Sequence, residues 1–274
     1  MARQPVIFLL DIGNSRIKGG LYSPEGLVST GLIPSYDAKE LTSIDILKLW
    51  RSSEAPDGIL LSSVASPSLM DIIETRLFSA WKCRIHHVHA DSMAYGVSNA
   101  YEVHPERLGA DRWASLIAAH HYIGKPVCIV DCGTTITFDA IDAWGKHMGG
   151  MIVPGLCMMK QALLKKTGRL HGAIQSSMPI KTSSGEKWLP ANTNQAIEWG
   201  ILHSAIGFVN HAVMRLEHQC PHGFVRILTG GDAPKIVTSL PGTWRVENDW
   251  VLKGLSVIAA HEFGMALPEI EPSP

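Results

Sequence analysis

Two stretches of the chain share one order of residues: a short apolar run ends on an aspartate, and a glycine and small polar residues follow. The first is PVIFLLDIGNS, from Pro5 to Ser15, and the second is PVCIVDCGTT, from Pro126 to Thr135. An apolar run without polar alternation predicts a strand that is buried on both faces. Such a strand is rigid, so it fixes the position of the carboxylate at its end. We therefore expect two buried strands that present Asp11 and Asp131 at similar turns.

The segments that follow these two strands repeat as well. In each half, turns join three predicted strands, and helices then alternate with strands, which is typical of an α/β fold. We predict two duplicated domains, residues 1–123 and 124–274, with the break near Gly124. The predicted strands cover 6–10, 16–21, 27–33, 58–64, 84–88, 127–130, 134–143, 148–152 and 224–228, and the predicted helices cover 41–51, 67–81, 110–121, 158–166, 193–217, 233–240 and 250–264.

Composition narrows the class of protein. The 274 residues are 46% hydrophobic and 18% charged with a net charge of −1, which indicates a folded globular protein without general affinity for nucleic acid or anionic membranes. No apolar stretch reaches the ~18 residues of a membrane span, and the run at 6–10 is too short for a signal peptide. The five cysteines include no C-x-x-C pair. We expect reduced thiols and a cytoplasmic location.

The repeated turn suits phosphate chemistry. A glycine turn after a strand points backbone N–H groups outward, and the hydroxyls of Ser15 and Thr134 add donors. Lys18 could neutralise a phosphate, while Asp11 and Asp131 would face each other across a cleft and hold cations. A third loop, TGGD at 229–232, follows a predicted strand and opens a helix. A single D-x-G is usually only a turn, but two matched copies with TGGD favour phosphate binding, although neither G-x-x-x-x-G-K-[ST] nor G-x-G-x-x-G is present.

With these loops in place, the chain resembles the actin-like kinase superfamily, whose members are two duplicated ribonuclease-H-like domains with the nucleotide between them. Within that group it is similar to type III pantothenate kinases, which make 4′-phosphopantothenate from pantothenate and ATP, the first step toward coenzyme A. The resemblance covers nearly the whole chain, and its most specific part is LGADRW together with GGMIVPG. The motifs that carry it are DIGNSRIK, YEVHPERLGADRW, VDCGTTITFDAI, GGMIVPG, NTNQAIEWG and TGGD.

The resemblance implies roles for particular residues. Asp111 is the implied catalytic base, Asp131 the ligand of a monovalent cation (K⁺ or NH₄⁺), and Thr134 a contact to ATP. Thr193 is implied to close the substrate pocket of the neighbouring subunit, so a homodimer is expected. Asp11 is placed near Mg²⁺ and the transferred phosphate. The implied ATP loop comprises Asp11, Ile12, Gly13, Asn14, Ser15, Arg16, Ile17 and Lys18, and the implied pantothenate site comprises Tyr101, Gly109, Ala110, Asp111, Arg112 and Thr193.

The residues themselves bear on the role of Asp111. It opens a predicted helix and precedes Arg112, and both features favour a charged carboxylate, so we expect Asp111 to be ionised at neutral pH. A weak base suffices, because phosphoryl transfer has a loose transition state with late proton removal. Arg112 offers a planar fork that suits the substrate carboxylate. The alternative to a catalytic role is a structural one, in which Asp111 starts the helix and forms an ordinary ion pair with Arg112 at the surface.

Two other functional classes stay open on the sequence: a non-catalytic regulatory protein on the same fold, and a sugar kinase, acetate kinase or phosphatase of the same fold group. An assay of ADP release with pantothenate and K⁺ separates the first from a kinase, and a panel of substrates separates the second. The histidines at 86–89 and at 120–121 show no evident third metal ligand, so we expect no zinc site there.

Overall fold

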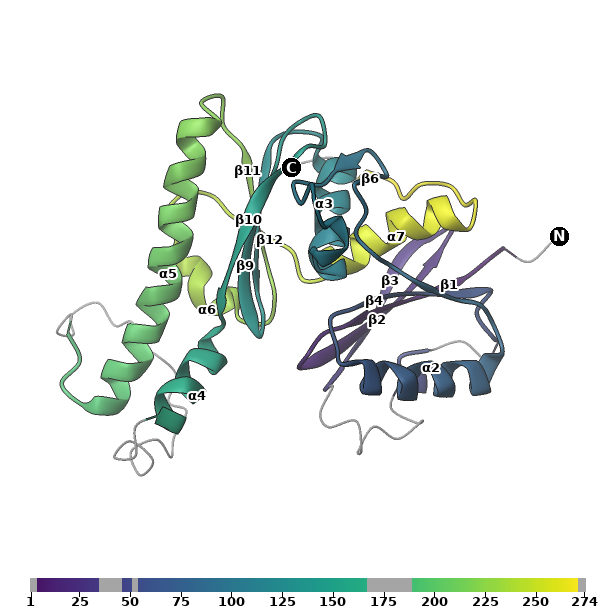
Figure 1. Ribbon diagram of the computed structural model, residues 1–274, viewed down its shortest axis with the longest axis horizontal. Coiled ribbons are helices and arrows are strands. Elements are labelled where there is room, and N and C mark those ends of the chain that lie inside the picture. The colour runs from purple at the N-terminus through teal and green to yellow at the C-terminus, as the bar shows by residue number, and fades with distance from the viewer. Residues whose placement is uncertain (1–3, 35–45, 51–53, 167–188, 271–274) are drawn as a thin grey trace.

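The computed structural model describes residues 4–34, 46–50, 54–166 and 189–270. Within these residues the chain forms two five-stranded sheets with helices between them and on their outer faces (Figure 1). The predicted helix at 41–51 falls largely outside the described residues. No described helix is both long enough and apolar enough to cross a membrane.

The first sheet contains the first of the two repeated strands. Its order is β3-β2-β1-β4-β5, in which β1, β2 and β3 are antiparallel neighbours and β4 and β5 run parallel to β1. Asp11 pairs with Lys18 on one side and with Ser62 on the other, so it sits within the paired end of β1. The strands are β1 (Ile7–Ile12), β2 (Arg16–Ser23), β3 (Gly26–Pro34), β4 (Gly58–Ser63) and β5 (Ile85–His87).

The second sheet repeats this arrangement strand for strand. Its order is β10-β9-β8-β11-β12, again with three antiparallel strands followed by two that run parallel to the first. The two sheets confirm the predicted duplicated fold of actin-like, ribonuclease-H-like domains. Each sheet lies on its own side of the proposed break at Gly124, and that boundary stays a prediction. The strands are β8 (Val127–Cys132), β9 (Thr135–Ile141), β10 (His147–Pro154), β11 (Val225–Thr229) and β12 (Arg245–Val246).

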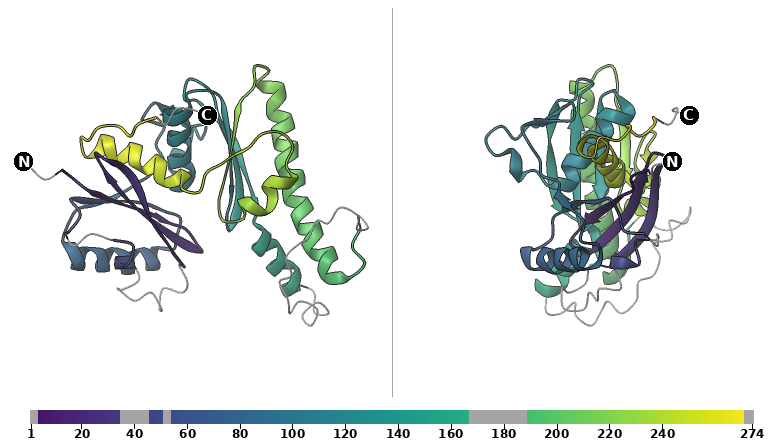
Figure 2. Two further views of the ribbon diagram at one scale, coloured as in Figure 1. Left: turned by 180° about the vertical axis from the view of Figure 1, so that it is seen from behind. Right: turned by 90° about the vertical axis from the view of Figure 1, so that its right-hand side faces the viewer.

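The helices divide into an inner pair and outer layers. α3 and α7 lie between the two sheets, α2 covers the outer face of the first sheet, and α4 and α5 lie on the outer side of the second (Figures 1 and 2). The predicted helix at 67–81 is confirmed, with Ser66 before it and Pro67 in its first turn. The helices are α2 (Pro67–Trp81), α3 (Ala110–Ile123), α4 (Leu156–Lys166), α5 (Thr193–Gln219), α6 (Ala233–Ile236) and α7 (Trp250–Glu262), with 3₁₀ turns η1 (Pro105–Arg107) and η2 (Val237–Ser239).

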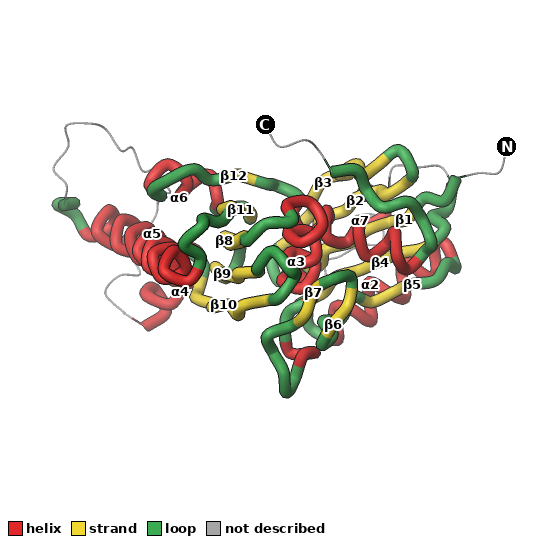
Figure 3. Tube along the Cα trace, turned by 90° about the horizontal axis from the view of Figure 1, so that it is seen from above, coloured by secondary structure: helices red, strands yellow, loops and turns green. Residues whose placement is uncertain are grey.

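The inner helix pair joins both sheets into one hydrophobic core. Ile7 and Leu9 of β1 belong to the same buried cluster as Val127 and Ile129 of β8, with α3 and α7 between them (Figure 3). The two helices approach closely, because a Cβ at Gly254 would lie 1.9 Å from the carbonyl oxygen of Ala114. The two halves are therefore connected by packed apolar side chains as well as by the chain itself.

A small hairpin lies within residues 91–108, which the sequence predicts as a loop-rich stretch without strands. β6 (Met93–Ala94) pairs with β7 (Val97–Ser98), and Ser98 forms a bridge to Lys146 beside β10. This segment lies beside α3 in Figure 3. It leads into the loop that carries Tyr101.

Candidate active site

A cavity of about 1120 Å³ lies where the ends of β1 and β8 meet. The first turn, the second turn and the TGGD loop all contribute to it, as predicted, together with the start of α3 and parts of α4 and α5. The polar and glycine residues that line it include Asp11, Gly13, Asn14, Ser15, Arg16, Lys18, Asp111, Asp131, Gly133, Thr134, Lys160, Glu198, Gly230, Gly231, Asp232 and Asp249.

The two repeated turns are each closed by a hydrogen bond from their glycine, the first being one residue longer, and they touch each other. The N–H of Gly13 donates to the carbonyl of Arg16 at 2.9 Å, and the N–H of Gly133 donates to that of Thr135 at 3.0 Å. Between the turns, the hydroxyl oxygens of Ser15 and Thr134 are 2.7 Å apart. The paired turns thus form one continuous polar surface across the cavity.

The TGGD loop abuts both turns and depends on its glycines. Gly230 has a φ of +94°, and a Cβ there would lie 2.4 Å from Asp131 Oδ1. A Cβ at Gly231 would lie 2.1 Å from Nη1 of Arg16. Since Arg16 comes from the first sheet, this loop brings a guanidinium of one half against the backbone of the other.

Asp11, Asp111 and Asp131 influence one another's charge in the cavity, and Lys18 lies near them. Burial, and then the charges of Asp111 and Asp131, raise the pKa of Asp11 to about 8, although Lys18 acts in the opposite direction. Burial and Asp111 likewise raise the pKa of Asp131 to about 6. Lys18 is held at the cavity wall, because its ammonium donates to the carbonyl of Asn248 and lies 3.9 Å from Asp249 Oδ1. Negative charge therefore exceeds positive charge here, and this is a donor set suited to a cation.

Asp111 opens α3 as predicted, but its electrostatic setting differs from the expectation. Its Oδ1 accepts the N–H of Arg112 at 2.8 Å. This bond and the charge of Arg112 favour ionisation, yet burial outweighs both and raises the pKa of Asp111. The helix terminus and Arg112 therefore do not keep this carboxyl at its ordinary acidity. Gly109 makes room for it, since a Cβ there would lie 2.5 Å from Asp111 Oδ1.

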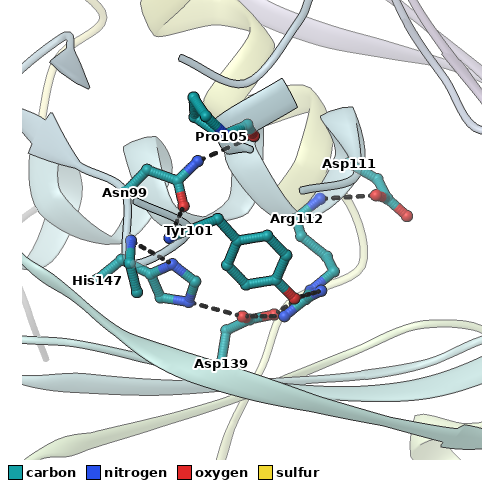
Figure 4. A network of polar contacts seen from close by, with 8 residues as sticks. Asn99, Tyr101, Pro105, Asp111, Arg112, Asp139 and His147 are labelled. Carbon is teal, nitrogen blue, oxygen red and sulfur yellow. Dashed lines mark hydrogen bonds and ion pairs between the residues drawn. The ribbon is translucent and has the colours of Figure 1, made fainter. Parts of the chain in front are cut away.

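Arg112 is also placed differently from the surface arginine of the structural alternative. It is buried, and its fork is already occupied: Nε and Nη2 donate to Asp139 Oδ2 and Oδ1 at 2.8 and 2.6 Å. Its Nη1 donates to the hydroxyl of Tyr101 at 3.1 Å, so these two predicted substrate residues do come together (Figure 4). The bidentate edge of Arg112 that we expected to bind a substrate carboxylate binds Asp139 instead.

Other predicted residues lie in different surroundings. The side chains of Ile12 and Ile17 are fully buried in the core of the first sheet, so only their backbones could serve the cavity. Ala110 is packed in the inner core, next to Asp111. Thr193 is exposed in the first turn of α5, after the N-cap Asn192, and does not line the cavity of its own chain.

Sequence reasoning missed two features of the site. One is Asp139, for which a signal existed, because a lone carboxylate in an otherwise apolar strand needs a buried partner. The other is the ion pair between Lys160 of α4 and Glu198 of α5, 3.0 Å long, in the wall of the cavity. No motif marks that pair.

Among the residues that the structure describes, no three histidine, cysteine or acidic side chains are close enough to hold a metal on their own.

The fold and the cavity define a protein of the actin-like fold class, with two similar sheets and phosphate-type turns around one cavity. A family model described as type III pantothenate kinase matches residues 7–215. The chain belongs to the type III pantothenate kinase family, so it is a kinase that transfers a phosphoryl group to an alcohol.

Individual relatives agree with this assignment. The chain is 36% identical to a type III pantothenate kinase of Halorhodospira halophila, with 93% of this chain and 98% of that protein covered. It is 34% identical to one of Nitrosococcus oceani, over 93% and 94% of the two chains.

Solved structures resemble the fold. A putative Baf family transcriptional activator from Campylobacter jejuni has a TM-score of 0.57 at 19% identity, covering 94% of this chain and all of that one. An activator of 2-hydroxyisocaproyl-CoA dehydratase from Clostridium difficile, with ADPNP bound, has a TM-score of 0.51 at 13% identity over 95% of both chains. At such low identity these two structures inform the fold alone.

Proposed function

We propose that the cavity phosphorylates the primary hydroxyl of pantothenate with ATP, and that Asp111 is the catalytic base. The observation that carries this proposal is the convergence of Asp11, Asp111 and Asp131, from three separate elements, on one cavity lined by the phosphate-type turns. The family reaction, phosphorylation of pantothenate on the route to coenzyme A, supplies the substrate class.

Asp111 would orient the substrate hydroxyl and take its proton late in the reaction. A carboxyl whose pKa is raised by burial is a stronger base when ionised than an exposed one, which suits this task. Its place in the first turn of α3 fixes its position, since its own carboxylate is bonded to the next backbone N–H. Arg112 follows Asp111 on α3 and donates to the Tyr101 hydroxyl. Neither side chain is among the residues that line the cavity, and both would bind the substrate next to Asp111.

The donor set fits two cations. Asp11 would hold Mg²⁺, and Asp131 would hold a monovalent cation, K⁺ or NH₄⁺. When bound, the divalent ion supplies charge neutralisation at the phosphate oxygens. Because these side chains do not close a protein-only shell among the described residues, water and phosphate oxygens would complete the coordination, as Mg²⁺ prefers. Ser15, Thr134 and the N–H groups of both turns would bind the ATP phosphates.

We further propose that the protein works as a cytoplasmic homodimer in which Thr193 of one subunit completes the substrate pocket of the other, without nucleic-acid or membrane partners. The exposure of Thr193 on α5, away from its own cavity, supports this arrangement. Light scattering would test it directly. A protein that is active but entirely monomeric would remove Thr193 from the site.

The test of the function is ADP release from ATP with pantothenate, with and without K⁺. We expect turnover that depends on pantothenate and is stimulated by K⁺. Folded protein that gives no turnover with both cations present would favour the regulatory alternative. Turnover only with another alcohol or a carboxylate substrate would reassign the acceptor.

A further inference from the structure

The contacts of Arg112 point to a group that the reaction scheme above does not use. Asp139 lies on β9 of the second sheet, and Arg112 lies on α3. Their side chains are 4% and 6% exposed and form a bidentate pair, with Nε–Oδ2 and Nη2–Oδ1 distances of 2.8 and 2.6 Å. A buried pair of this geometry fixes the guanidinium plane. The pair as a whole carries no net charge.

The remaining edge of Arg112 sets the hydroxyl of Tyr101. Nη1 donates to that oxygen at 3.1 Å, so the Tyr101 hydroxyl keeps its own proton for another acceptor. The Tyr101 backbone is anchored too, because its N–H donates to Oδ1 of Asn99 at 2.9 Å. Arg112 therefore determines which way this donor points (Figure 4).

His147 completes the support under Asp139. It is buried, with Nε2 3.0 Å from Asp139 Oδ1, and its Nδ1 accepts the N–H of Ala100 at 3.4 Å. A ring nitrogen that accepts a backbone N–H carries no proton, so we assign the proton to Nε2, which donates to Asp139. The ring also lies nearly parallel to that of Tyr101, with centroids 6.2 Å apart and planes 23° apart. One histidine thus orients the carboxylate and packs beside the tyrosine.

Gly150 shows that β10 is shaped around this pair. A Cβ at this position would lie 2.2 Å from Asp139 Oδ1 and 2.3 Å from Arg112 Nη2. Any side chain would therefore displace one of the two charged groups. This contact gives a physical reason for the second glycine of the GGMIVPG motif.

We infer that Asp139, oriented by His147, is a positioning residue: it holds Arg112 and the Tyr101 hydroxyl in the geometry that binds pantothenate beside Asp111. The inference rests on the proposed function, because it assumes that Tyr101 and Arg112 contact the substrate. It adds that a residue of the second sheet, Asp139, determines the orientation of the binding group on α3. A substitution at Asp139 should therefore weaken the binding of pantothenate more than the binding of ATP.

The experiment compares Asp139→Asn with wild type in the ADP-release assay. Asparagine keeps the shape but lacks the charge and can accept at only one of its two terminal atoms. We expect the KM for pantothenate to rise on the order of tenfold or more, because a displaced binding group loses alignment. The KM for ATP should stay within about twofold of wild type, which corresponds to less than 0.5 kcal/mol. The matched control is Phe138→Leu, on the same strand, whose side chain packs into the opposite core.

Gly150→Ala provides a second arm that removes no charged group but displaces Asp139 or Arg112 from the pair. It should raise the KM for pantothenate in the same way, and direct titration of each variant with pantothenate by calorimetry should show the same loss of affinity. A lower melting temperature with an unchanged KM for pantothenate in either soluble variant would make the network merely structural and overturn the inference. If the wild-type protein neither turns over nor binds pantothenate, the proposed function itself is wrong. That outcome is distinct from failure of the positioning inference, in which wild type is active and only the variants decide.

Discussion

The hydroxyl oxygens of Ser15 and Thr134 lie 2.7 Å apart, although 119 residues separate them in the chain. Ser15 belongs to the turn after β1 and Thr134 to the equivalent turn after β8. This contact joins the two repeats at the place where the phosphates of ATP are proposed to bind. One of the two hydroxyls donates to the other, and the accepting hydroxyl keeps its own proton for a phosphate oxygen.

Removing either hydroxyl should weaken ATP use by a similar amount. For Ser15→Ala or Thr134→Ala we expect the KM for ATP to rise about fivefold, the effect of a hydrogen bond worth about 1 kcal/mol. Because the two groups interact, the double variant should lose less than the sum of the single losses. The control is the exposed hydroxyl pair of Ser66 and Ser68, 3.2 Å apart, which does not line the cavity. Fully additive losses at positions 15 and 134 would show that the groups act independently.

Asp111→Asn should abolish most turnover while the protein stays folded. A missing general base lowers kcat by about 10²- to 10⁴-fold. Circular dichroism and melting temperature should match wild type, because the shape of the side chain is kept. Asp71→Asn, at an exposed position on α2, is the control and should be fully active. A near-normal kcat in Asp111→Asn would assign the base elsewhere.

Asp131→Ala should remove activation by monovalent cations. Wild-type activity is expected to increase with KCl or NH₄Cl at constant ionic strength, since Asp131 would hold the cation. The variant should give a flat response over the same range, measured by ADP release with a large inert cation as the replacement salt. An unchanged dependence on K⁺ would exclude this role for Asp131.

Stability should fall as the pH rises when no cation is bound. The ordinary pKa of Asp11 is near 3.8, and burial raises it to about 8 in the folded protein. Between these values the folded protein holds a proton that the unfolded chain has released, so the free energy of unfolding decreases with pH. Asp11→Asn cannot ionise. At pH 8 in a chelator, it should melt roughly 2–4 °C above wild type, equivalent to about 1 kcal/mol.

Mg²⁺ should reverse that difference, because a bound cation stabilises only the ionised carboxylate. Thermal melts at pH 5 and pH 8, with and without MgCl₂, would show both effects. At pH 5 the difference between variant and wild type should be smaller than at pH 8. A wild-type protein whose melting temperature is constant from pH 5 to 8 in chelator would contradict the raised pKa.

The sequence was sufficient for the strands that carry Asp11 and Asp131, because local signals specify them: an apolar run, then aspartate, then glycine. Helix α2 was predicted from its serine-proline start in the same way. The resemblance added Asp111, and the structure places it in the cavity with the other two carboxylates.

Long-range contacts were the part that local signals could not provide. The periodicity of residues 250–264 predicted a helix but not its position between the sheets. The partner of Arg112 is Asp139, 27 residues away, and only the folded register of β9 brings them together. The raised pKa of Asp111 depends on burial by the assembled core, which a helix-start argument omits.

The position of α7 also affects how the chain folds during its synthesis. This helix packs between the sheets near the end of the chain, yet it covers β1, which is synthesised first, and buries Trp250 against the carbonyl of Ser115 at 3.1 Å. At translation rates of about 5–20 residues per second, roughly 10–50 s pass between the synthesis of β1 and that of α7. The apolar inner face of the first sheet is exposed during this interval. Truncation before Trp250 should therefore yield an aggregating chain rather than a smaller folded domain.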